Sequence, residues 1–363
     1  MKVVVAPDKF AGTLSAAQAA AAMRTGWLRA RPDDEVVAVP MADGGEGTID
    51  VVAAATMSSR RQTVEVADAR SRAVAAQWLW LPDGRALLET AQACGLSRLS
   101  AAERDPKSTT TYGVGQLLAE VARCGAAEVV VGLGGSATVD GGAGMAIALG
   151  HRLLRADGNG VKVGGEHVAA LRQVVRAPPL GPRVVAAADV ANPLLGAQGA
   201  VATFAAQKGA GAHDLPILEA ALTAMADTVE RDVPGGPWRE LPGAGAAGGL
   251  GFALAALLGA KLLPGAAAIA ELVGLDAALD GAEVVITGEG SLDAQTGRGK
   301  VPAYVAERAR SAGARVYACA GRVVGNAGDA FDAVADLGPD GMVRAAELVS
   351  ERTERLAAQV EEQ

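Results

Sequence analysis

Aromatic side chains are scarce in this chain, because Phe, Trp and Tyr together make up 3% of its 363 residues. Hydrophobic residues nevertheless reach 50%, and much of that count is alanine. The core must therefore be built from Val, Leu, Ile and Ala, a composition that suits helices packed closely on a parallel β-sheet. The length exceeds that of a usual single domain and predicts two α/β domains or one large one.

Histidine and cysteine are equally rare, with three of each. The histidines show neither HExxH spacing nor a partnering Cys or Ser motif, which argues against a zinc site and a hydrolase triad. Cys94, Cys124 and Cys319 are far apart and form no CxxC pair. We therefore expect reduced, buried thiols in a cytoplasmic protein.

A dominant charge of one sign is also missing, because the formal net charge is only -8 and acids and bases are mixed throughout. This argues against a nucleic-acid groove and against an anionic membrane surface as partners. The chain starts without a signal-peptide pattern. The uncharged stretch 241–260 is rich in glycine and predicts a turn entering a buried helix, not a membrane span. We expect a soluble protein.

Strand and helix signals alternate from the first residues. Apolar strands are expected at 3–6 and 35–39, and a helix between them to about residue 31. Ser15 and Gln18 have the spacing of a capping box that opens this helix. This βαβ beginning predicts a parallel sheet whose loops gather at the carboxyl ends of its strands.

The pattern changes after residue 62, where short strands at 63–66, 73–81 and 86–89 predict an antiparallel meander. The βα pattern returns at 283–286 and continues with a strand at 315–320. We therefore predict a discontinuous domain made of residues 1–65 and 280–363. Residues 66–279 would form an inserted α/β domain with a mixed sheet.

The most informative motif is the glycine-rich stretch 132–144, which follows the apolar strand 128–131. Glycines let the backbone approach a phosphate closely, and amides at a helix N-terminus point their positive dipole end at it. Ser136 and Thr138 add hydroxyls, and the carboxylate of Asp140 could hold a metal ion. The alternative is a turn that simply connects a strand to a helix.

Four further loops combine glycine with acidic, basic or hydroxyl residues: 7–13, 41–48, 189–196 with 207–209, and 287–293 with 297–300. Carboxylates at the ends of parallel strands suit Mg²⁺ binding and the removal of a hydroxyl proton. Lysines and glycine amides can neutralise a transferring phosphoryl group. No GxxxxGK[ST] motif is present, so a phosphotransferase of this sequence is not a P-loop enzyme.

Two alternatives stay open on the residues alone. Gly132, Gly134 and Ala137 match the dinucleotide fingerprint, and Asp157 follows twenty residues beyond Ala137. This spacing favours an NAD-dependent hydroxy-acid oxidoreductase, although it leaves the acidic loops unexplained. A nucleotide sensor that binds ATP and transfers nothing is the other alternative.

The loops together resemble the bacterial glycerate kinase family of the two-domain, glycerate 2-kinase-like type. The resemblance runs in order from residue 3 to about 321 and rests on these stretches: 6–8, 12–16, 40–48, 110–115, 132–144, 189–194, 207–210, 242–251, 287–290, 293 and 299–301. It implies a flavodoxin-like domain plus a second α/β domain, with the active site in the cleft between them. One departure is Ala11, where members commonly carry a lysine.

The resemblance implies ATP-dependent phosphorylation of D-glycerate with Mg²⁺, with 2-phosphoglycerate favoured over 3-phosphoglycerate as product. We assign Asp189 as the base or as the partner of the substrate hydroxyl, supported by Asn192, and Lys208 and Lys300 as charge stabilisers. The predicted nucleotide-binding residues are Gly134, Gly135, Ser136, Ala137, Thr138 and Asp140. The predicted substrate-binding residues are Asp8, Lys9, Asp43, Gly44 and Gly45. The predicted metal ligands are Asp43, Glu289 and Asp293. The oligomeric state is left open, with a homo-oligomer as one alternative.

Overall fold

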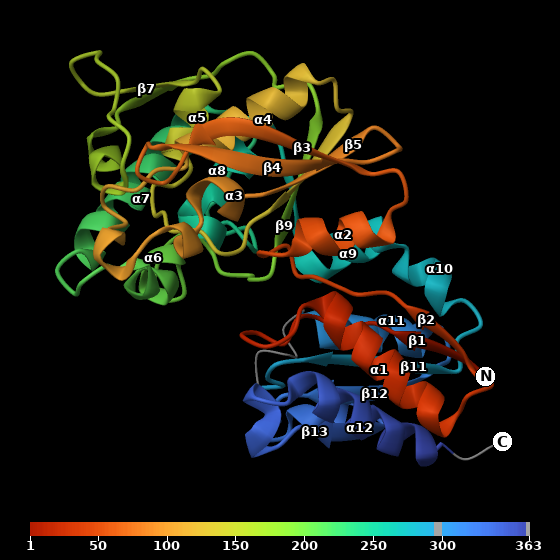
Figure 1. The fold of residues 1–363 in the computed structure, drawn as a ribbon. Coiled ribbons are helices and arrows are strands. Elements are labelled where there is room, and N and C mark those ends of the chain that lie inside the picture. The colour runs from red at the N-terminus through yellow and green to blue at the C-terminus, as the bar shows by residue number, and fades with distance from the viewer. Residues whose placement is uncertain (294–299, 361–363) are drawn as a thin grey trace. The chain divides into compact units, whose positions relative to one another are not determined.

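The computed structural model describes residues 1–293 and 300–360. The chain forms two compact units, which are drawn in Figure 1. The first unit contains Met1–Asp43, Asp50–Met57 and Ala266–Gln363, and the second contains Gly44–Ile49 and Ser58–Gly265. Compared with the predicted division, residues 44–49 and 58–65 lie in the second unit and residues 266–279 in the first. The assignment of these units as domains stays a prediction.

A five-stranded parallel sheet forms the centre of the first unit. Its strand order is β13-β12-β11-β1-β2, which is the flavodoxin-like order 2-1-3-4-5 when the strands are renumbered along the unit. The strands are β1 (Lys2–Val5), β2 (Glu35–Ala38), β11 (Val284–Glu289), β12 (Arg315–Ala320) and β13 (Ala333–Asp336). The helices are α1 (Ala16–Ala30), α10 (Leu275–Leu279), α11 (Val301–Ser311) and α12 (Ala345–Ala358), with α2 (Thr48–Ala55) and α9 (Gly265–Val273) at the unit boundaries.

Both faces of this sheet are covered by helices. Helices α1 and α12 lie together on one face (Figure 1), and Trp27 and Met23 of α1 are fully buried there. A Cβ at Gly26 would lie 2.0 Å from the carbonyl oxygen of Ser350, so only glycine permits this close approach of the two helices. The predicted capping box is confirmed, because Gln18 N donates to Ser15 Oγ and Ser15 N donates to Gln18 Oε1.

The second unit contains a six-stranded mixed sheet in the order β10-β9-β6-β5-β4-β3. The first four strands are parallel, and β4 and β3 continue the sheet as the predicted antiparallel meander. The fold is therefore α/β with one parallel and one mixed sheet, as predicted. The strands are β3 (Arg60–Ala67), β4 (Ala73–Trp80), β5 (Arg85–Glu89), β6 (Glu128–Gly132), β9 (Arg183–Ala188) and β10 (Lys261–Pro264), with β7 (Arg152–Leu154) and β8 (Gln173–Val175) as a separate pair.

The helices of this unit surround a single apolar cluster that includes both sheet and helix residues. They are α3 (Ala91–Cys94), α4 (Tyr112–Arg123), α5 (Ala143–Ala148), α6 (Ala200–Phe204), α7 (Leu215–Asp232) and α8 (Ala246–Leu258). The glycine-rich stretch before residue 258 does enter a buried helix, α8, as predicted. None of the helices in the described part of the chain combines the length and apolar character that a bilayer crossing requires.

The cysteines are free thiols, as predicted. Cys94 and Cys319 are buried, but the prediction of burial is wrong for Cys124, which is exposed. Cys124 follows the last residue of α4, where the helix ends at the surface of the unit.

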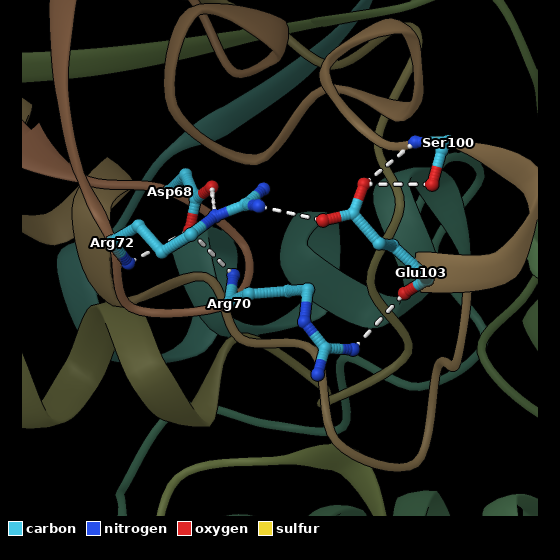
Figure 2. A network of polar contacts seen from close by, with 5 residues as sticks. All are labelled: Asp68, Arg70, Arg72, Ser100 and Glu103. Carbon is cyan, nitrogen blue, oxygen red and sulfur yellow. Dashed lines mark hydrogen bonds and ion pairs between the residues drawn. The ribbon is translucent and has the colours of Figure 1, made fainter.

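The turn between β3 and β4 is organised by one buried carboxylate, Asp68 (Figure 2). Asp68 accepts hydrogen bonds from the backbone amides of Arg70 and Arg72 and from Arg72 Nε, at 2.7–2.9 Å. Arg72 Nη1 continues the network to Glu103. The carbonyl of Ala69 in the same turn accepts the amide of Thr110 at 3.0 Å.

We expect Asp68→Ala to lower the free energy of unfolding by about 2–3 kcal/mol, because it removes a buried charged acceptor that three donors share. Asp83→Ala is the matched control, since Asp83 makes similar bonds to Arg85 in the next hairpin from a half-exposed position. That variant should change stability by less than about 1 kcal/mol. Urea unfolding followed by circular dichroism measures both. An equal decrease in the free energy of unfolding of the two variants would contradict the stabilising effect that we attribute to the burial of Asp68.

Candidate functional site

Two neighbouring parallel strands of the second unit, β6 and β9, bring part of the predicted site together at their carboxyl ends. Gly132 pairs with Ala187 in register, and Leu133 N donates to the carbonyl of Ala187 at 3.0 Å. The glycine-rich turn follows β6, and Asp189 follows β9. Ligands of α/β proteins bind at this edge of the sheet.

A pocket of about 320 Å³ opens at this edge. The residues that line it come from the glycine-rich turn, from the segment after β9, from the segment 204–208 and from two apolar neighbours. They are Leu96, Leu133, Gly134, Gly135, Ser136, Asp189, Val190, Phe204, Gln207, Lys208 and Ala247. Five predicted site residues therefore line one pocket, although they are up to 74 positions apart in the sequence.

Lys208 is the buried cation of this pocket, with only 3% of its surface exposed. Its ammonium donates to Ser136 Oγ and to the carbonyl of Thr138, both at 2.8 Å. Burial lowers the pKa of Lys208 to about 8, and Cys94 and Asp140 oppose that shift. An ammonium has three donors, so one N–H remains beyond these two bonds.

The rest of the predicted nucleotide-binding turn is directed into the protein. Ala137, Thr138 and Asp140 are fully buried and do not line the pocket. Helix α5 has six residues and begins at Ala143, well after the turn leaves the pocket lining.

The predicted use of amides at the helix N-terminus is wrong for α5. Gly144 N donates to the carboxylate of Asp140, and Met145 N donates to Thr111 Oγ1. Protein groups thus already satisfy these amides, and only the segment 133–136 of the turn lines the pocket.

Two other predicted groups also lie in the second unit. The side-chain amide of Asn192 donates to the carbonyl of Gln198 at 2.6 Å and to Thr203 Oγ1 at 3.3 Å, so it fixes the loop after Asp189. Gly44 and Gly45 pack against the start of the turn. A Cβ at Gly134 would lie 2.4 Å from the Cα of Gly45, so this contact requires glycine.

The predicted substrate-binding residues Asp8, Lys9 and Asp43 lie in the first unit, after the adjacent strands β1 and β2. Asp8 is 7% exposed and accepts the amide of Lys9 at 2.7 Å. Lys9 Nζ lies 3.8 Å from Asp43 Oδ1. Burial, followed by the charge of Asp43, raises the pKa of Asp8 to about 7. The charges of Asp8, Lys9 and Asp43 therefore influence one another at the ends of β1 and β2.

Glu289 is the last residue of β11, which pairs with β1 on the side opposite to β2. The charge of Glu289 also raises the pKa of Asp8. Lys300 Nζ lies 3.9 Å from Glu289 Oε2. Asp293 is half-buried in the following loop. Within residues 1–293 and 300–360, no three His, Cys, Asp or Glu side chains are grouped as a ready metal site. The part of the predicted loop at 297–299 lies outside the described residues.

Sequence reasoning missed several residues of the site. Phe204 and Leu96 line the pocket, but nothing in their local pattern distinguishes them from packing residues. Gln207 also lines it and lies in the predicted loop 207–209, where it was given no role. Thr110 and Thr111 were quoted for the family resemblance without a role. Consecutive threonines before a helix were the available signal, because threonine is favoured at the helix N-cap.

The two sheets and the pocket define an α/β protein in which a glycine-rich turn lies beside a carboxylate and a buried ammonium. A family model described as the glycerate kinase family matches residues 3–362. The chain belongs to the glycerate kinase family, whose members are phosphotransferases.

Individual relatives agree with this assignment. A glycerate kinase of Halalkalibacterium halodurans is 39% identical, with 93% of this chain and 89% of the relative covered. The glycerate 2-kinase of Escherichia coli K12 is also 39% identical, with 90% and 87% covered. The crystal structure of a Salmonella typhimurium LT2 protein assigned as glycerate kinase 2 is similar, with a TM-score of 0.85, 37% identity, and 99% and 97% covered. None of these comparisons supports the oxidoreductase alternative.

Proposed function

We propose that this chain transfers the γ-phosphoryl group of ATP to the 2-hydroxyl of D-glycerate. The observation that carries the proposal is the pocket that joins the turn 134–136, Asp189 and Lys208. Two relatives that cover most of the chain bear the names glycerate kinase and glycerate 2-kinase. We further infer that the protein works in the cytoplasm.

The second unit supplies the groups that phosphoryl transfer needs. The backbone at Gly134 and Gly135 and the hydroxyl of Ser136 would hold phosphate oxygens. The ammonium of Lys208 would neutralise charge on the transferring group. Asp189 is exposed at the pocket and would accept the proton of the attacking hydroxyl. Positioning and charge neutralisation account for most of the catalysis expected of such a site.

The carboxylates of the first unit are suited to a divalent cation. The charge of Asp43 and that of Glu289 both raise the pKa of Asp8, and a bound cation would relieve this repulsion between like charges. Asp43, Glu289 and Asp293 are the residues we propose for Mg²⁺, which in kinases is commonly held by one or two carboxylates plus phosphate oxygens. When bound, Mg²⁺ would neutralise phosphate charge. Asp8 and Lys9 are proposed to contact the substrate, and Lys300 to stabilise charge.

A coupled ADP-release assay tests the proposal. With Mg-ATP, ADP should form rapidly only when D-glycerate is added. Binding of ATP without glycerate-dependent ADP formation would support the silent nucleotide sensor. A thermal shift with NADH and none with Mg-ATP would support the oxidoreductase. Either result would contradict the proposed kinase activity.

A further inference from the structure

Three consecutive threonines, Thr109, Thr110 and Thr111, are buried directly before α4, and the mechanism above gives them no role. Thr109 Oγ1 donates to the carbonyl of Ala137 at 2.9 Å. The amide of Thr111 donates to Asp140 Oδ2 at 2.8 Å. Each end of this threonine segment therefore bonds to the glycine-rich turn, 28 or 29 positions further along the chain.

Asp140 is the centre of these contacts. Besides the amide of Thr111, its carboxylate accepts the Thr111 hydroxyl at 3.0 Å and the amides of Gly142 and Gly144 at 3.1 Å. The Thr110 hydroxyl lies 3.4 Å from Oδ2. Burial raises the pKa of Asp140, while these hydrogen bonds oppose that effect. The carboxylate is thus engaged on all sides by groups of the protein.

The packing leaves the turn little room to move. A Cβ at Gly144 would lie 2.1 Å from Thr110 Oγ1, and a Cβ at Gly248 would lie 1.9 Å from the carbonyl of Thr138. Gly141 N donates to the carbonyl of Gly248 at 3.0 Å. The threonine segment and α8 therefore hold the second half of the turn between them.

The first half of the same turn carries the pocket residues. Lys208 donates to Ser136 Oγ and to the carbonyl of Thr138. The ammonium therefore contacts residues 136–138, which are held in place by the bonds of Thr109 to Ala137 and of Thr111 to Asp140. A displacement of residues 137–140 would move both the Ser136 hydroxyl and the ammonium.

We propose that Thr109, Thr111 and Asp140 are positioning residues, which hold the turn so that Gly134, Gly135, Ser136 and Lys208 meet the phosphates of ATP. Asp140 is thereby assigned a supporting role in place of direct nucleotide contact. This inference rests on the proposed kinase function.

The first test compares Thr111→Val with Thr111→Ser. Valine keeps the shape but removes the hydroxyl that bonds to Asp140 and Met145, and we expect the KM for ATP to rise about tenfold. Serine keeps the hydroxyl, so the KM for ATP of Thr111→Ser should stay within about threefold of the wild-type value. Thr353→Val in α12 is the matched control, because Thr353 is fully buried and its hydroxyl donates to the carbonyl of Val349 at 2.8 Å. It should lower the melting temperature and leave KM unchanged.

The second test is the pH dependence of Asp140→Asn. The charged or titratable groups that influence Lys208 are Asp140 and Cys94, and burial raises the pKa of Cys94 to about 12, so this thiol is neutral at pH 7–9. Asp189 lines the same pocket in every variant. Removing the charge of Asp140 lowers the pKa of Lys208, so the alkaline loss of kcat/KM should begin at lower pH than in the wild type.

The outcomes distinguish failure of the kinase function from failure of the positioning role. A wild-type protein without glycerate-dependent ADP formation would overturn the proposed function. An active wild type together with a folded Thr111→Val of unchanged KM would overturn the positioning role. If Thr111→Val does not fold, Thr109→Val, which loses one bond to Ala137, takes its place under the same criterion. An unshifted pH profile in folded Asp140→Asn would also contradict the proposal.

Discussion

Replacing Asp189 by Asn is expected to lower kcat by a factor on the order of 10²–10⁴ while the fold stays intact. Asparagine keeps the volume of the side chain but cannot accept the proton of the attacking hydroxyl. Asp189 follows β9 and is exposed at the pocket, so its loss should leave the core unchanged. Steady-state kinetics with saturating ATP and glycerate measure the effect, and the melting temperature should stay within a few degrees of the wild type.

Asp157→Asn is the control for this experiment. Asp157 is exposed after β7 and accepts the amide of Asn159 at 3.0 Å, and it is the acidic residue that the dinucleotide fingerprint of the oxidoreductase alternative includes. Its replacement should leave kcat unchanged. A wild-type kcat in Asp189→Asn would refute the base assignment. A large loss of stability in that variant would instead indicate a structural role.

The second large effect is expected for Lys208→Met, which should lower kcat/KM for ATP by a factor on the order of 10²–10³. Methionine retains the apolar length of the side chain but removes the charge and the bonds to Ser136 and Thr138. Because the pKa of Lys208 is about 8, the ammonium is protonated below that pH and neutral above it. Wild-type kcat/KM should therefore fall as the pH rises through about 8, and Lys208→Met should lack this fall.

Lys107→Met controls for the loss of a lysine from the same unit. Lys107 Nζ forms an ion pair with Asp214 at 2.6 Å and is partly exposed. Its replacement should cost little in stability and leave the pH profile of kcat/KM unchanged. A Lys208→Met enzyme with the wild-type profile would show that another group titrates near pH 8.

Local patterns were sufficient to predict much of the fold. The capping box of Ser15 and Gln18 depends on residues three positions apart, and the meander of β3, β4 and β5 depends on alternation and short turns. The strand β6 and the glycine-rich turn that follows it could also be predicted from one short stretch of sequence. In each case the decisive interactions lie close together in the sequence, so a single stretch contains the information.

The site could be predicted only in part, because its remaining contacts are distant in sequence. The position of Asp140 among glycines predicts a carboxylate that binds a ligand. In the structure, Thr110 and Thr111, about 30 positions earlier, bury this carboxylate and donate hydrogen bonds to it. Burial of Lys208 likewise depends on the turn that it contacts, 70–72 positions before it. Local patterns could name these residues as candidates, but the direction of their side chains, into the pocket or into the protein, is set by tertiary packing.

The central claim is tested most directly by a ³¹P NMR spectrum of the products formed from D-glycerate and Mg-ATP. We expect ADP and a single new phosphomonoester resonance that coincides with added 2-phosphoglycerate, and no such resonance with Asp189→Asn. A resonance that coincides with 3-phosphoglycerate would contradict the proposed hydroxyl. Inorganic phosphate as the only new product, or no consumption of ATP, would contradict the kinase assignment itself.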